Sequence, residues 1–153
     1  MSVKTSNTGL LLCQIWVALI LCVAAIGPEL FPASAETNLE ILQPPSTQHL
    51  LGTDEDGRDI ISMLVAGART AALVGILTVL FSGVVGTFLG TISGYLGGTV
   101  DRAVLTATEA VYAFPGILLA IFLMFLVPRP GISHIIAALC VSGWATYARL
   151  TRG

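Results

Sequence analysis

The chain has 153 residues, of which 55% are hydrophobic and only 10% are charged, and its formal net charge is -2. Soluble domains carry about 25% charged residues, so this chain has too few charges to build a water-facing surface. Together with a mean hydropathy of +0.89, this composition predicts an integral membrane protein. The small negative charge and the lack of a basic tract exclude nucleic-acid binding as the expected function.

The first apolar run covers residues 10–26 and follows a polar start that contains Lys4. Its length is about 17 residues, the lower limit for a membrane-spanning helix. We expect residues 1–9 to be a cytoplasmic N-terminus and 10–27 to be the first transmembrane helix. A competing hypothesis is a cleaved signal peptide, because Lys4, the apolar run and Ala33-Ser34-Ala35 resemble its charged start, apolar core and cleavage site.

The segment 28–69 is rich in prolines and acidic residues, which predicts an extracytoplasmic loop. In its last part, 56–69, an apolar stripe lies opposite charged side chains, and Thr53 with Asp56 offers an N-terminal cap. We expect this amphipathic helix to lie along the membrane surface. The stripe consists of Ile60, Ile61, Leu64, Val65 and Ala68.

Three further apolar runs, at about 70–95, 103–127 and 132–150, predict three more spans. The first of them holds no charge, and the second is expected to kink at Pro115. The fold class is therefore all-α: a polytopic transmembrane protein with about four spanning helices and a short interfacial helix. Lys and Arg near the helix ends favour a cytoplasmic location for Arg102 and Arg152, with Trp144 and Tyr147 as interfacial anchors on that side.

Small side chains recur every fourth residue in the run 70–95 and form one face of the predicted helix. Such a ridge lets another helix approach closely, whether from the same chain or from another subunit. Glycine is common in membrane helices, but five small residues in strict register favour a packing face. The residues are Thr78, Ser82, Gly86, Gly90 and Gly94.

Glu109 is an ionisable residue near the start of the run 103–127. Carboxylates inside a membrane are candidates for function. Two interpretations stay open: a structural role near the interface, paired with Arg102 or Arg149, and a role in transport.

No group of residues predicts an enzyme, a metal site or a cofactor site. The cysteines lie in apolar runs without CxxC spacing, and the acidic residues 54–56 lack the alternate spacing of an EF-hand loop. His49 and His134 have no neighbouring arrangement that predicts a catalytic base. The chain also lacks a Walker A motif and a dinucleotide fingerprint.

Several motifs occur in a fixed order: the segment 49–59 (HLLGTDEDGRD), Gly67-Ala68-Arg69, residues 94–98 (GYLGG) with Asp101-Arg102, and residues 144–153 (WATYARLTRG). Together they resemble the dipeptide/oligopeptide/nickel family of ABC-transporter permeases. The first two are similar to the family's stretch before its second spanning helix, the third to the turn after that helix, and the last to a family ending. Two departures are a glutamate at Glu109, where the family usually has aspartate, and Leu50, where it has proline.

The resemblance covers roughly residue 48 to the C-terminus and implies that 70–153 is a partial permease transmembrane domain. The family continues into a cytoplasmic EAA loop, so we expect a truncated permease, a partial chain or one half of a split subunit. The implied function is ATP-driven import of peptides or related small solutes across the bacterial inner membrane. The implied partners are a second permease, two ATP-binding subunits and an extracytoplasmic solute-binding protein. The alternative function is a small standalone membrane protein that self-associates through the glycine ridge as a channel or structural factor.

Overall fold

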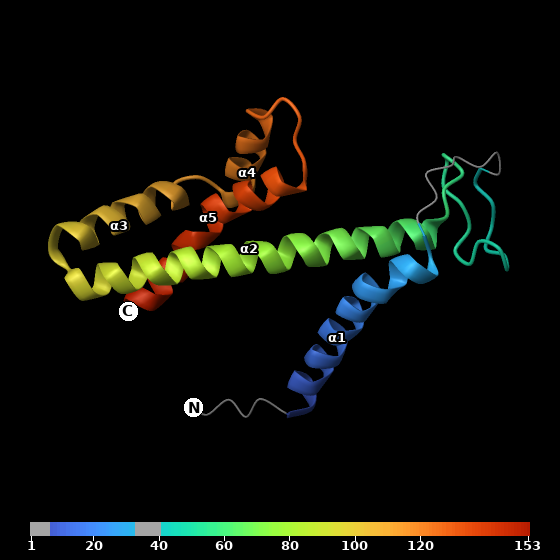
Figure 1. Ribbon diagram of the computed structural model, residues 1–153, viewed down its shortest axis with the longest axis horizontal. Helices are drawn as coiled ribbons and strands as arrows, with labels where there is room; N and C mark the ends of the chain where they lie inside the picture. The colour runs from blue at the N-terminus through green and yellow to red at the C-terminus, as the bar shows by residue number, and fades with distance from the viewer. Residues whose placement is uncertain (1–6, 33–40) are drawn as a thin grey trace. The chain divides into compact units, whose positions relative to one another are not determined.

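The computed structural model describes residues 7–32 and 41–153, which form five helices joined by loops (Figure 1). Within these residues there is no strand, only an isolated bridge between Thr53 and Asp59. The predicted all-α class of membrane protein is confirmed. Two compact units, Met1–Leu73 and Val74–Gly153, divide the chain within helix α2. Lys4 and Ala33-Ser34-Ala35 lie outside the described residues, so the signal-peptide hypothesis stays a prediction.

Helix α1 (Asn7–Leu30) is apolar and exposes almost all of its side chains, as a lipid-facing helix does. It runs past the predicted end at residue 27 and contains Pro28 in its last turn. Gly27 lets the helix approach the start of α2: a Cβ at this position would lie 2.7 Å from Val65 Cγ1. Ala24 and Val65 are accordingly buried in this first unit.

The loop 41–59 is held together by backbone and side-chain hydrogen bonds that the sequence did not reveal. The Asp54 carboxylate accepts the amides of Asp56 and Arg58, and Gly57 has a left-handed backbone with φ 74°. This turn reverses the chain, so no helix begins at residue 56. The predicted cap was therefore wrong: Thr53 Oγ1 accepts the Gln43 amide instead.

Asp59 is the residue that caps α2 (Ile60–Leu96). Its Oδ1 accepts the Ser62 amide at 3.0 Å, which is the geometry of an N-cap, and its Oδ2 lies 2.8 Å from His49 Nδ1. Burial by itself would raise the pKa of Asp59. The hydrogen bonds from the Ser62 amide and from His49 outweigh it and hold this pKa below the ordinary value of 3.8.

Helix α2 is continuous over 37 residues, so the predicted interfacial helix 56–69 is not a separate element. At 1.5 Å per residue α2 is about 55 Å long, well beyond the ~30 Å hydrocarbon core of a bilayer. The amphipathic stripe is thus the first part of the same helix. The physical reason is that the stretch 60–70 contains no proline and only one glycine, Gly67, so nothing ends the helix there.

The predicted third span is broken at the predicted position. Helices α3 (Gly98–Tyr112) and α4 (Gly116–Phe125) are bent by 83° around Pro115, so the pair is either a broken span or a re-entrant loop. Gly97 and Gly98 both have a positive φ, at 61° and 57°, which allows the tight turn from α2 into α3. In Figure 1 α4 folds away from α3 and lies beside α5.

Helix α5 (Ile132–Arg152) is less apolar than α1 and α2 and carries Arg149 and Arg152 in its last turn. By length and composition, the described part of the chain has two helices able to cross a membrane, or three if α3 and α4 form one span. This count is lower than the predicted four because α4 is short and α5 carries more polar and small side chains.

We predict that Asp59→Ala destabilises the first unit by about 1 kcal/mol, the usual cost of losing an N-cap. Because folding lowers the pKa of Asp59, its stabilising effect is present above pH 3.8 and is lost as the pH falls through the folded-state value. Hydrogen exchange of the α2 first-turn amides in detergent micelles measures both effects. Glu55→Ala, at an exposed loop position, is the control. Equal exchange in the two variants would contradict the capping role.

Candidate functional site

The candidate site is the interface between the second part of α2 and α5, where the predicted ridge of small residues lies. A Cβ at Gly86 would come within 2.6 Å of Tyr147 Cβ, and one at Gly94 would lie 3.1 Å from the Arg152 carbonyl oxygen. At Gly90 it would overlap Ala148 and Thr151. The backbones of α2 and α5 therefore approach so closely that only glycine fits at positions 86 and 90, and a larger residue at position 94 would be tight.

Small residues on α5 complete this interface, and the sequence analysis did not single them out. Ala145 and Ala148 are fully buried, and Gly143 faces Ser82, where a Cβ would lie 2.5 Å from Ser82 Oγ. These three residues of α5 are spaced by two and three positions, which predicts a packing face less clearly than the regular four-residue spacing on α2 does. Tyr147 packs against α2 at Gly83 and Gly86, and its role as an anchor at the membrane interface stays a prediction.

A polar cluster joins three helices at one end of this interface. Arg152 Nε and Nη2 donate to the two carboxylate oxygens of Asp101 at 2.5 and 2.7 Å, and Ser93 Oγ donates to Asp101 Oδ1 at 2.6 Å. Ser93 is fully buried and comes from α2, while Asp101 and Arg152 come from α3 and α5. The two-pronged pairing fixes the position of the α5 end relative to the α2–α3 turn. These three residues form the Asp101 cluster.

Glu109 lies outside this cluster. Its side chain is exposed on α3 and, within the described residues, forms no ion pair. Arg149, one of the two predicted partners, lies instead over the ring of Tyr112 at 4.5 Å from the ring centre. The Tyr112 hydroxyl in turn donates to Thr146 Oγ1 at 3.1 Å. The interpretation of Glu109 as a structural residue is therefore not supported by a pair with Arg149. A role of Glu109 in transport stays a prediction.

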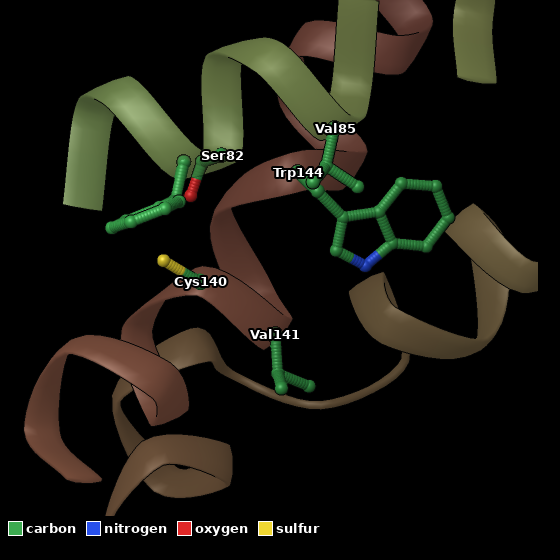
Figure 2. A pocket seen from close by; sticks show the side chains of 6 residues that line it. Ser82, Val85, Cys140, Val141 and Trp144 are labelled. Atoms are coloured by element: carbon green, nitrogen blue, oxygen red, sulfur yellow. The ribbon is translucent and has the colours of Figure 1, made fainter. Parts of the chain in front are cut away.

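A small pocket opens beside the ridge, between α2 and α5, with a volume of about 240 Å³ (Figure 2). Its walls are mostly apolar, and Ser82 is a polar residue among them. The Ser82 hydroxyl is buried and has no hydrogen-bond partner. The lining residues are Phe81, Ser82, Val85, Cys140, Val141 and Trp144.

Both histidines have structural hydrogen bonds. His49 pairs with Asp59, as described above, and His134 Nδ1 accepts the Gly131 amide at the start of α5. The sequence analysis missed the His49–Asp59 pair because the two residues are ten positions apart in a loop without periodicity. No three potential metal ligands come together in residues 7–32 and 41–153.

No protein-family profile matches the chain. Individual relatives do match it over most of its length. It is 40% identical over 132 residues to the dipeptide transport system permease protein DppC of Bacillus subtilis. The aligned residues make up 85% of this chain and 41% of DppC. It is 34% identical over 142 residues to the glutathione transport system permease protein GsiD of Pectobacterium atrosepticum, and this alignment covers 91% of the chain and 47% of GsiD. It is 32% identical over 152 residues to the oligopeptide transport system permease protein OppC of Bacillus subtilis, and this alignment covers 98% of the chain and 48% of OppC.

The chain belongs to the family of ABC peptide-transporter permeases. It spans about half the length of the relatives it matches. The family and the apolar helices make this permease chain a multi-pass protein of the bacterial inner membrane. The relatives are named as permeases and not as enzymes.

We predict that Gly90→Leu destabilises the permease chain by about 1–3 kcal/mol, because the added side chain overlaps Ala148 and Thr151 on α5. Thermal unfolding in detergent, followed by circular dichroism, measures the change. Gly75→Leu is the matched control: it has the same gain in helix propensity, and nothing lies within 4 Å of its Cβ position. Equal melting temperatures for the two variants would mean that α5 does not lie on the ridge.

We also predict that Asp101→Arg and Arg152→Asp each lower the melting temperature, and that the double reversal recovers most of the loss. Each single variant places like charges together, whereas the reversed pair restores the attraction. Arg102→Asp is the control, since Arg102 is the exposed neighbour of Asp101. Additive losses in the double variant would show that the pair contributes no coupling.

Proposed function

We propose that the chain forms part of the membrane-spanning permease subunit of an ATP-driven importer of peptides or related small solutes. The observation that carries the proposal is its similarity, over 85–98% of its length, to permeases named for dipeptide, glutathione and oligopeptide transport. The proposed partners are a second permease, two ATP-binding subunits and an extracytoplasmic solute-binding protein. We place α1, α2, the bent pair α3–α4 and α5 in the membrane, with the segment between α1 and α2 on the extracytoplasmic side.

The packing of the second unit supports this function. A transporter that alternates between inward and outward access moves rigid groups of helices against one another. Glycine contacts between α2 and α5, together with the Asp101 cluster, join α2, α3 and α5 into such a group. In this proposal the group moves as one body when the ATP-binding subunits close.

The rival function, self-association through the glycine ridge, has less support. In the structure α5 of the same chain already covers Gly86, Gly90 and Gly94. A second copy could use this ridge only if α5 left it. We therefore assign the ridge to packing within the chain and propose no channel function.

The proposal predicts that disrupting the coding sequence in its host abolishes uptake of radiolabelled alanyl-alanine in a strain whose other peptide transporters are deleted. Uptake of free alanine should not change. Re-expression should restore dipeptide uptake, whereas the Gly90→Leu chain should restore it poorly and the Gly75→Leu chain well. A tagged chain, crosslinked in membranes, should co-purify with an ATP-binding subunit. Normal dipeptide uptake in the disrupted strain, with the tagged chain recovered only as a homo-oligomer, would refute the proposal.

A further inference from the structure

Polar and oppositely charged residues form an exposed strip where α3 meets α5. The Tyr112 hydroxyl of α3 donates to Thr146 Oγ1 of α5 at 3.1 Å, and the Arg149 guanidinium lies 4.5 Å from the centre of the Tyr112 ring. Glu109 precedes Tyr112 by three positions, which places both residues on one face of α3. All four residues are exposed, and together they form the charged strip.

Neither charge of the strip is neutralised within residues 7–32 and 41–153. The ion pairs in this part of the chain involve other residues, and neither the Glu109 carboxylate nor the Arg149 guanidinium takes part in a hydrogen bond. The Tyr112 ring covers one face of the guanidinium and leaves its N–H donors unused. The strip therefore offers a free acceptor group and a free donor group of opposite charge.

The strip lies farther along the helices than the Asp101 cluster. The positively charged helix ends predict that this cluster lies at the cytoplasmic membrane surface. Glu109 follows Asp101 by eight positions on α3, about 12 Å of helix, which places it within the ~30 Å hydrocarbon core. A charged side chain that faces lipid at this depth is costly, and such residues usually face a water-filled path or a partner of opposite charge. The strip is therefore suited to a charged ligand and not to lipid tails.

The chemistry of the strip selects a ligand that carries both charges. An ammonium group complements the Glu109 carboxylate, and a carboxylate complements the forked donors of Arg149. Glu109 is one turn, about 4.5 Å along α3, from the Tyr112 ring that holds Arg149. An extended dipeptide is about 7 Å long, so its two termini suit two charged groups with this offset. A purely anionic ligand would be repelled by Glu109.

We propose that the charged strip binds the two termini of a transported dipeptide: Glu109 pairs with the α-ammonium group and Arg149 with the α-carboxylate. This assignment of the ligand rests on the proposed import function. Tyr112 and Thr146 are positioning residues, because the ring holds the guanidinium and the hydrogen bond between their side chains joins α3 to α5. A longer peptide would reach only one of the two charged groups at a time.

Group-specific labelling in membrane vesicles tests both contacts in the unaltered chain. Dicyclohexylcarbodiimide modifies carboxyl groups and phenylglyoxal modifies guanidinium groups, and mass spectrometry locates the adducts. Glu109 is the only acidic residue in 102–153, so its adduct is unambiguous. Alanyl-alanine at four times its dissociation constant should slow the labelling of Glu109 and Arg149 about fivefold. N-acetyl-alanyl-alanine should protect Arg149 alone, and alanyl-alanine amide should protect Glu109 alone.

Variants at the two charged positions test each contact separately. In Arg149→Gln, alanyl-alanine should protect Glu109 only as well as alanyl-alanine amide does. In Glu109→Gln, alanyl-alanine should protect Arg149 only as well as the N-acetylated peptide does, whereas Glu109→Asp keeps the charge and should keep the difference. Arg129, in the loop between α4 and α5, is the control: its labelling should not respond to peptide, and Arg129→Gln should leave the protection of Glu109 unchanged.

Three outcomes of the labelling would overturn the proposal. The first is labelling of Glu109 and Arg149 that alanyl-alanine does not slow, and the second is equal protection of both residues by all three compounds. The third is a loss of labelling, without peptide, when phosphatidylcholine vesicles are replaced by phosphatidylethanolamine-containing ones, which would assign the strip to a lipid headgroup.

Dipeptide uptake in the host separates the strip from the import function. Protection of both residues without dipeptide uptake would refute the import function and leave the strip as a dipeptide-binding site. Normal uptake without protection would refute the strip alone.

Discussion

The close approach of α2 and α5 is the constraint on which the second unit depends. Three glycines in four-residue register remove the side chains that would hold the helices apart, and buried alanines on α5 complete the contact. In lipid there is little hydrophobic gain from helix association, so van der Waals contact over this surface supplies much of the stabilisation. The position of α5 in turn decides where α4 packs and where the pocket lies.

Polar contacts determine the ends of the helices. At one end the Asp101 cluster connects α2, α3 and α5, and before the start of α2 the pair of His49 and Asp59 joins the loop to the helix cap. Both contacts use motifs that also support the family resemblance: the GRD of residues 57–59 and the RG ending of residues 152–153. These residues therefore have a structural explanation, and none of them needs to touch a transported solute.

The same packing buries polar groups between the two helices. Bringing α5 onto α2 places the Cys140 thiol on the Thr78 carbonyl, and the Ser82 hydroxyl is buried there without a hydrogen-bond partner. Gly143 makes room for the Ser82 side chain at this point. The buried, unpaired Ser82 hydroxyl thus accompanies the packing of the two helices and is not part of any local motif.

The sequence by itself determined the membrane class, the apolar runs, the break at Pro115, the ridge and the family, because each depends on composition, periodicity or residue order. Only the tertiary structure showed that Asp59 caps α2, that Asp101 meets Arg152, and that Ser82 lies unpaired in a pocket with Cys140. Asp101 and Arg152 are 51 residues apart, and Cys140 and Thr78 are 62 apart. Local patterns carry no information on such distant pairs, because the pairs form only when whole helices pack and set the distances between side chains.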